Sequence, residues 1–212
     1  MNGASQLIQY VAAKGHSYGD VTPMKLQKLL YYVKVWGLVA GYQTVPLLFE
    51  KWDYGPVNPS VYYEYQDYGA DSIPVSQVVD PPDTWSPPMC DLADMVIVSY
   101  APFSAFVLSA MTHEDTPWQD TPKNEVISEA KMRQYYKTQR FAKNFPFDAK
   151  EGPFYPVESN LTYAYILDMN KRDAEAVTVY PSFEAYHRHL READSHAKQA
   201  LASFTDALAS GE

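Results

Sequence analysis

The chain has 212 residues, a formal net charge of −9 and a single cysteine. This length allows one domain with an extension or two small domains. The charge argues against a protein that binds nucleic acid by neutralising phosphates, and it would suit a basic protein partner. One cysteine excludes an internal disulfide and a thiolate zinc cluster. The sequence has no basic leader followed by an apolar run and no stretch of about 18 apolar residues, so we expect a cytoplasmic protein that does not span a membrane.

The strongest local pattern predicts a helix from Pro23 to Ala40. Thr22 is a suitable N-cap, proline is favoured at the first helical position, and Gly41 supplies the stop. Apolar residues recur at three- and four-residue steps and predict one buried face, made of Leu26, Leu29, Leu30, Val33, Trp36, Gly37 and Ala40. We expect the opposite side to carry three lysines, Lys25, Lys28 and Lys34.

An aromatic segment follows this helix. Residues 47–54 alternate as in a short strand, Gly55 permits a left-handed turn, and Pro56 fixes the exit. Pro56 and Pro59 argue against a regular element between them, and Pro59 can open a tyrosine-rich helix. The segment is first of all a rigid structural turn. Exposed Trp and Tyr side chains on such a turn would also form a protein-binding hot spot, and the two interpretations are compatible.

Shorter elements are predicted on both sides of these segments. An amphipathic helix occupies residues 5–13, and a proline-rich linker occupies residues 74–89. Three more helices are expected at residues 91–99, 104–111 and 124–140. The first two of these three begin at Asp and Ser, residue types that cap helix N-termini.

The composition changes at residue 141. Two β-biased segments, residues 161–169 and 176–180, could pair as a hairpin. A long helix then begins after Ser182. Its apolar stripe consists of Phe183, Tyr186, Leu190, Ala193, Ala197, Leu201, Phe204 and Leu208. We interpret this stripe first as part of a core, with a partner-binding face as the alternative.

These elements predict a mainly α fold that contains one small β element and could therefore also be classed as α+β. We expect a compact helical domain over residues 1–140. A C-terminal extension over residues 141–212 would hold the β-hairpin and the long helix.

Few residues suggest chemistry. His113, Glu114 and Asp115 are adjacent, but no nucleophile motif accompanies them, so we interpret them as a polar turn rather than as a catalytic or metal site. His189 and His196 share a face of the last helix without the spacing of a zinc pair. The sequence contains no phosphate-binding or dinucleotide-binding motif. We therefore expect a non-enzyme without cofactor or metal, and an enzyme that uses residues 113–115 remains the weaker alternative.

Two blocks with a specific spacing resemble the Panacea domain of the SocA/GepA-like family. The first is L-Q-K-L-L-Y-Y at residues 26–32, and the second is W-x-Y-G-P-V-x-P-x-V-Y at residues 52–62. L-S-x-x-T-H with the following P-W, at residues 108–118, resembles a further block, and residues 127–136 resemble the closing helix. Gln119 stands where the family often has lysine. The resemblance covers roughly residues 5–140.

The resemblance implies a largely helical antitoxin of a bacterial or prophage toxin–antitoxin pair, which neutralises a cognate protein toxin by direct contact. One branch of the family is similar to a proteolytic adaptor, which implies a AAA+ protease as a possible second partner. We predict a shared aromatic surface with neighbouring residues, formed by Lys28, Tyr31, Tyr32, Trp52, Tyr54, Gly55, Pro56 and Tyr62. Toxin-specific contacts are predicted on the last helix, at Tyr186, Leu190, Leu201 and Phe204.

Overall fold

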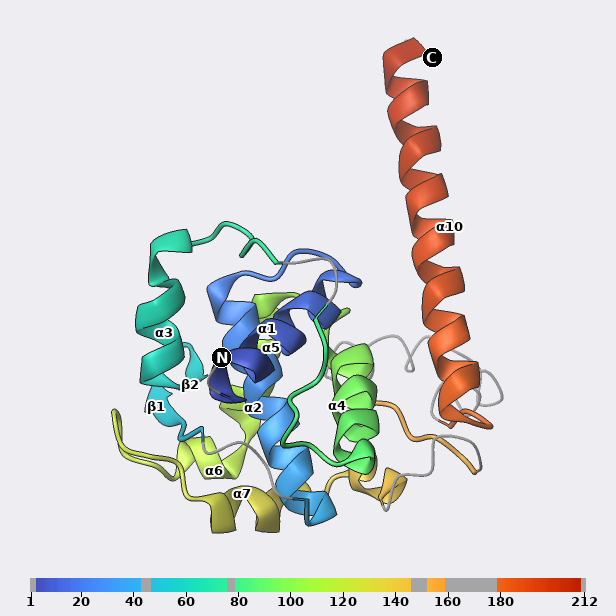
Figure 1. Ribbon diagram of the computed structural model, residues 1–212. Helices are drawn as coiled ribbons and strands as arrows, with labels where there is room; N and C mark the ends of the chain where they lie inside the picture. The colour runs from blue at the N-terminus through green and yellow to red at the C-terminus, as the bar shows by residue number, and fades with distance from the viewer. Residues whose placement is uncertain (1–2, 43–46, 76–78, 146–151, 159–178, 211–212) are drawn as a thin grey trace.

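The computed structural model describes residues 3–42, 47–75, 79–145, 152–158 and 179–210. The helix α2 (Pro23–Ala40) runs through the middle of the body (Figure 1). The helices that pack against it are α1 (Gly3–His16), α3 (Pro59–Tyr65), α4 (Pro87–Tyr100), α5 (Ala105–Glu114) and α7 (Glu129–Tyr136). The described part of the chain therefore has one core, centred on α2.

Both ends of α2 confirm the prediction from the sequence. The Thr22 hydroxyl accepts a hydrogen bond from the backbone N–H of Lys25 at 3.3 Å, and Pro23 occupies the first helical position. Gly41 ends the helix in the left-handed conformation, with φ 77°. These signals are local, so they need no knowledge of the rest of the fold.

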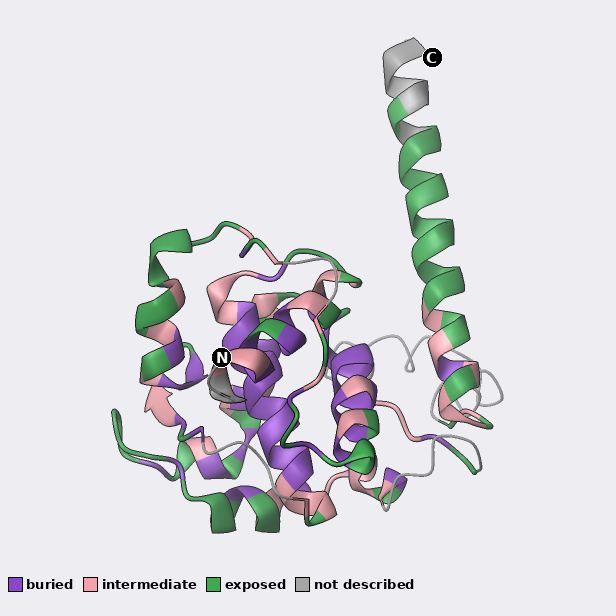
Figure 2. Cartoon of the chain, viewed as in Figure 1, coloured by how far each residue is buried: buried purple, intermediate pink, exposed green. Residues whose placement is uncertain are grey.

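The prediction that the lysines of α2 lie on an exposed side is wrong. Every residue from Lys25 to Gly37 is buried, as the purple α2 of Figure 2 shows. Because helices and the hairpin surround α2, its polar side chains must find partners inside the fold. The Lys28 ammonium donates to the Pro56 carbonyl oxygen at 3.0 Å, and Lys34 pairs with Glu129 at 2.6 Å.

A small antiparallel hairpin lies beside α2 and leads into α3. Its strands are β1 (Glu50–Trp52) and β2 (Gly55–Val57), with Trp52 opposite Gly55. The prediction that the prolines exclude a regular element here is wrong. Pro56 lies in β2, which among the described residues pairs only with β1, and an edge strand tolerates proline. The prediction that Pro59 opens the next helix is confirmed, and the Asn58 side chain caps it. The short helix η1 (Gln66–Tyr68) follows α3.

Two helix starts differ from the prediction. The helix α4 begins at Pro87, with Ser86 at its N-cap position. Proline is favoured at the first helical position because the backbone N–H that it lacks would have no partner within the helix there. The helix α7 begins only at Glu129. The preceding residues extend the sheet instead: the Lys51 N–H donates to the Glu125 carbonyl at 3.0 Å, and the Ile127 N–H donates to that of Phe49 at 2.8 Å. The four-residue helix α6 (Thr116–Gln119) lies between α5 and this segment.

The C-terminal part consists of η2 (Arg140–Asn144), a bridge between Phe154 and Tyr180, and α10 (Phe183–Ser210). Most of the predicted hairpin lies outside the described residues. The predicted cap of the long helix is confirmed, since the Ser182 hydroxyl accepts from the Ala185 N–H at 3.1 Å.

The long helix α10 extends away from the body (Figures 1 and 2). From residue 191 onward every position of it whose burial is described is exposed. The interpretation of the apolar stripe as core is therefore wrong beyond its first two turns, because no described segment packs against it there.

The fold is mainly α with one small β element, as the sequence predicts. Among the described residues no single helix has both the length and the apolar character to cross a membrane. In the described part of the chain, α4 and α5 meet the length and composition test as a pair, and they are bent by 105° relative to each other.

Candidate partner-binding site

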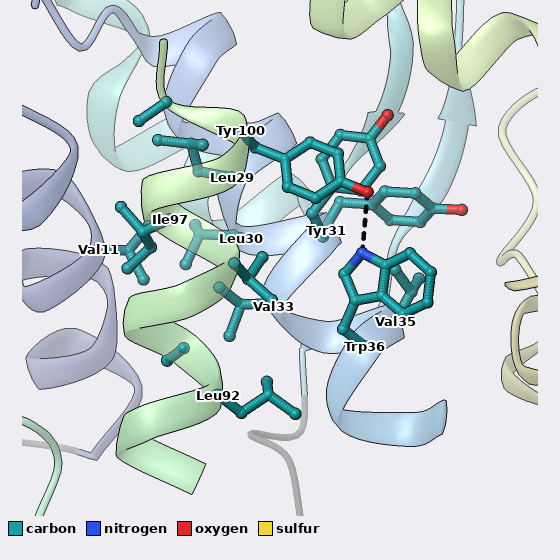
Figure 3. Packing of buried hydrophobic residues seen from close by; sticks show 14 of the residues in the cluster. Val11, Leu29, Leu30, Tyr31, Val33, Val35, Trp36, Leu92, Ile97 and Tyr100 are labelled. Atoms are coloured by element: carbon teal, nitrogen blue, oxygen red, sulfur yellow. Dashed lines mark hydrogen bonds between the residues drawn. The ribbon is translucent and has the colours of Figure 1, made fainter. Parts of the chain in front are cut away.

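The predicted aromatic residues divide into a buried group and a surface group. Tyr31 and Tyr32 are buried, with 0% and 2% of their surface exposed. The ring of Tyr32 stacks on Tyr100 at 3.9 Å, and Tyr31 meets Phe49 edge to face at 5.4 Å. The prediction that Tyr31 and Tyr32 share a surface with the aromatic turn is therefore wrong. They pack in the core beside Trp36, whose indole N–H donates to the Tyr100 hydroxyl at 2.9 Å (Figure 3).

The surface group borders a pocket of about 340 Å³ between α2, the hairpin and α3, which we call the aromatic pocket. Trp52 and Tyr62 form part of its wall, with ring centroids 4.9 Å apart and planes inclined at 61°. Tyr54 stands at the pocket with 67% of its surface exposed. The complete lining is Met24, Gln27, Lys28, Trp52, Asp53, Tyr54, Val57, Tyr62, Lys123 and Asn124.

Polar contacts hold the turn that carries these rings. The Trp52 indole N–H donates to a Glu50 carboxylate oxygen at 3.0 Å, and the Ser109 hydroxyl of α5 donates to the Tyr54 carbonyl at 2.8 Å. Asp53 and Lys123 form an exposed ion pair at 2.7 Å. The aromatic side chains are thus presented on a turn that is tied to two other segments of the fold.

Lys28 lies in the wall of the aromatic pocket and is fully buried. Its ammonium donates to the Pro56 carbonyl oxygen at 3.0 Å, and burial lowers its pKa to about 7. Among the described residues no carboxylate forms an ion pair with it. Buried lysines are usually paired, so this one is an unbalanced cation beside a pocket.

Gly55 and Pro56 are buried and shape the pocket without forming its surface. Gly55 has φ 98°, and a Cβ atom there would lie 2.5 Å from the Thr112 hydroxyl and 2.9 Å from Lys28 Cε. Only glycine permits this approach of the hairpin to α2 and α5. These two buried residues therefore position the neighbouring aromatic rings, and neither of them lines the pocket.

The side chains at residues 113–115 have separate environments. His113 stacks on Trp118 with ring centroids 4.2 Å apart, and Glu114 is exposed. Asp115 is buried and accepts a hydrogen bond from the Tyr136 hydroxyl, and burial raises its pKa to about 6. The described residues contain no group of three or more His, Cys, Asp or Glu side chains suited to hold a metal ion.

We expect the variant Asp115→Asn to change the pH dependence of stability. The pKa of Asp115 is raised from 3.8 to about 6 in the folded protein. The folded state therefore holds the proton more tightly than the unfolded chain, and the carboxyl group lowers stability as pH rises from about 4 to about 6. Asparagine has no such proton to lose. The variant's free energy of unfolding, minus that of the original protein, should increase by up to about 3 kcal/mol over this range.

Urea unfolding of both proteins at pH 4, 5, 6 and 7 measures this difference. The comparison cancels the titration of the other carboxylates, which both proteins share. A difference that stays constant with pH would contradict the buried, protonated state of Asp115.

The predicted residues of α10 also have different environments. Tyr186 is buried at the base of the helix, where its ring lies 4.8 Å from that of Phe154. Leu190 is half-buried, and Leu201 has 66% of its surface exposed. The side chain of Phe204 lies outside the described residues. Tyr186 therefore fixes α10 to the body, and Leu201 lies on the part that extends beyond it.

The structure does not bring the two predicted surfaces together. The hairpin and α3 lie on one side of the body and α10 on the other (Figure 1). Sequence reasoning also missed Met24 and the segment with Lys123 and Asn124, which complete the aromatic pocket. Met24 stands one helical turn before Lys28, a spacing that could have indicated it. Nothing in the local sequence around Lys123 points to a pocket formed with residues more than 60 positions earlier.

Comparison with known proteins agrees with the resemblance of the two sequence blocks. Residues 26–119 match the family model described as antitoxin SocA-like, Panacea domain. This range includes α2 from Leu26, the hairpin and α3, and therefore most of the aromatic pocket. Neither the curated proteins nor the solved structures contain a match. Residues 26–119, a little under half of the chain, are thus similar to the SocA-like Panacea domain.

Proposed function

We propose that this protein is an antitoxin that neutralises a cognate protein toxin by binding it directly. The observation that carries the proposal is the unpartnered apolar stripe of α10. The helix is amphipathic, and beyond Leu190 its stripe is not covered by any described segment. At ~1.5 Å per residue, the part whose exposure is described, residues 191–205, is about 20 Å long. An apolar helical face of this kind is what a groove on a partner protein binds.

The two parts of the chain would then have different tasks. Residues 1–140 form the domain that presents the aromatic pocket, with Trp52, Tyr54 and Tyr62 as side chains of the types that dominate binding hot spots. Residues 141–212 supply α10, whose exposed stripe would make the contacts specific to one toxin. Because different toxins present different surfaces, we place the variable contacts on the extension.

Co-expression of this protein with the product of a small reading frame adjacent to its gene tests the proposal. We expect that frame to be toxic alone and harmless in the presence of this protein. The variant Leu201→Glu should abolish protection, because it places a charge on the apolar stripe. Gln199→Glu adds the same charge about 160° away around the helix, given ~100° per residue, and should keep protection. Both positions are exposed, so neither change should affect folding.

A frame that is harmless alone, or toxic regardless of this protein, would contradict the proposal. Protection by both variants would leave α10 without a role in binding. The abundance of the toxin separates two mechanisms. A toxin that stays abundant but inactive supports blocking by direct binding, whereas a shortened half-life would identify the protein as an adaptor for a AAA+ protease.

A further inference from the structure

The wall of the aromatic pocket carries a lysine whose protonated form has no balancing carboxylate among the described residues. The charged residues that line the pocket are Lys28, Asp53 and Lys123. Asp53 is already paired with Lys123 at 2.7 Å. Lys28 therefore remains without an anion in the described part of the chain, although the protein as a whole has a net charge of −9. A local cation in an acidic protein favours an acidic ligand at this place.

The Lys28 ammonium also has unused hydrogen-bonding capacity. An ammonium group carries three donors, and within the described residues one acceptor, the Pro56 carbonyl oxygen, is hydrogen-bonded to it. The other side chains of the pocket wall are largely apolar, with Met24 and Val57 beside the rings of Trp52 and Tyr62. The pocket thus combines an apolar wall with a cationic donor, which suits an apolar body that carries a carboxylate.

We propose that the aromatic pocket receives an acidic side chain of the protein partner together with an adjoining apolar side chain, and that Lys28 binds the carboxylate. This inference rests on the proposed function, because it assigns a chemistry to the segment of the toxin that binds here. A volume of about 340 Å³ is enough for side chains but not for a whole helix. The pocket therefore selects a short segment of the partner.

A purely structural role for Lys28 makes a different prediction. In that case the lysine only fixes the hairpin to α2 through Pro56, and the pocket has no preference for charge. Binding of short peptides to the full-length protein distinguishes the two roles. The probes are N-acetyl-Phe-Glu-amide and N-acetyl-Phe-Gln-amide, which differ by one charge. The Trp52 indole N–H signal in NMR, assigned with a Trp52→Phe variant, reports binding at the pocket.

We expect the Glu peptide to bind at least about tenfold more tightly than the Gln peptide, since a charge-assisted hydrogen bond replaces a neutral one. Equal affinities, or no shift of the Trp52 signal with either peptide, would overturn the inference. N-acetyl-Phe-Gln with a free C-terminal carboxylate is a third probe. If it binds as tightly as the Glu peptide, the assignment to an acidic side chain is overturned in favour of a chain terminus.

Variants at Met24 keep the test independent of folding. Met24 is half-buried and stands four residues before Lys28 on α2. Met24→Glu places a carboxylate of the chain itself within reach of Lys28, in the favourable Glu-to-Lys order near a helix N-terminus. This variant should fold and lose the Glu peptide. Met24→Gln is the matched neutral control: it makes the apolar wall polar in the same place without adding a charge, and it should still bind the Glu peptide more tightly than the Gln peptide. If both variants bind the Glu peptide equally well, Lys28 is not the binding group.

The effect of pH adds a second readout. Because the pKa of Lys28 is about 7, the affinity for the Glu peptide should fall when pH rises from 7 to 9, while that for the Gln peptide should not change. The other titratable groups around Lys28 are His113 from α5, Asp53 from the hairpin turn and Lys123. Burial and the charge of Lys28 lower the pKa of His113 below 6.5, so this group is already neutral over the range tested. A parallel pH response of both peptides would overturn the assignment to Lys28.

Failure of this inference and failure of the proposed function give different results. If the toxin is neutralised while the pocket shows no preference for the Glu peptide, the antitoxin role stands and the pocket assignment is overturned. If the Glu peptide binds through Lys28 while no toxin is neutralised, the assignment of the pocket stands and the antitoxin role fails.

Discussion

Replacing Trp36 by alanine is expected to destabilise the protein by about 3–5 kcal/mol, the usual cost of removing a large buried aromatic side chain. Trp36 is 1% exposed, and its ring contacts those of Tyr136 and Phe141, with centroid distances of 5.3 and 4.7 Å. The alanine variant would leave a cavity where α2, α7 and η2 meet. It would also leave the Tyr100 hydroxyl without the indole donor. Urea unfolding at pH 7 measures the loss.

Two control variants separate the contributions. Tyr100→Phe removes only the hydroxyl that accepts from the Trp36 indole, and it should cost about 1–3 kcal/mol because a buried donor loses its partner. Phe106→Ala removes an aromatic ring that is 73% exposed and should change stability by no more than about 0.5 kcal/mol. If Trp36→Ala costs no more than Phe106→Ala, the described packing around α2 is incorrect.

The second large effect is expected at Gly55. The variant Gly55→Ala should cost about 2–5 kcal/mol, from the strain of a left-handed backbone and from overpacking together. The backbone has φ 98° at this position, and the new Cβ would lie 2.5 Å from the Thr112 hydroxyl and 3.0 Å from Lys28 Nζ. The hairpin must therefore move away from α2 and α5. The hydrogen bond from Lys28 to the Pro56 carbonyl oxygen should weaken as a consequence.

Gly41→Ala is the matched control for this variant. Gly41 also has positive φ, at 77°, but a Cβ atom there would have no neighbour within 4 Å. The control should show only the backbone cost, about 1–2 kcal/mol. The difference between the two variants measures the steric part at Gly55. Equal losses in urea unfolding would contradict the close approach of the hairpin to Lys28.

The candidate site could be predicted in part. A turn specified by its glycine and prolines carries Trp52, Tyr54 and Tyr62. Because these signals are local, the turn and its aromatic side chains could be predicted without knowledge of the rest of the fold. Lys28 was predicted beside them, but on an exposed surface. Lys123 and Asn124 were not predicted, because their distance along the chain from Trp52 gives no local signal. The pocket exists only where these segments meet.

The sequence by itself determines the elements that depend on neighbouring residues. Thr22, Pro23 and Gly41 define the ends of α2, and Asn58 with Pro59 defines the start of α3, because caps and proline constraints act within a few residues. The two blocks at residues 26–32 and 52–62 likewise carry the family resemblance without any knowledge of the fold.

Only the tertiary structure decides which faces are buried. The periodicity of α2 predicts one apolar face, yet neighbours on every side bury Lys28, Tyr31 and Tyr32 as well. The stripe of α10 has the same kind of periodicity, and Leu201 on it remains exposed. Periodicity reports how side chains are distributed around a helix. Burial depends on how many other segments reach that helix, and this is a property of the whole fold.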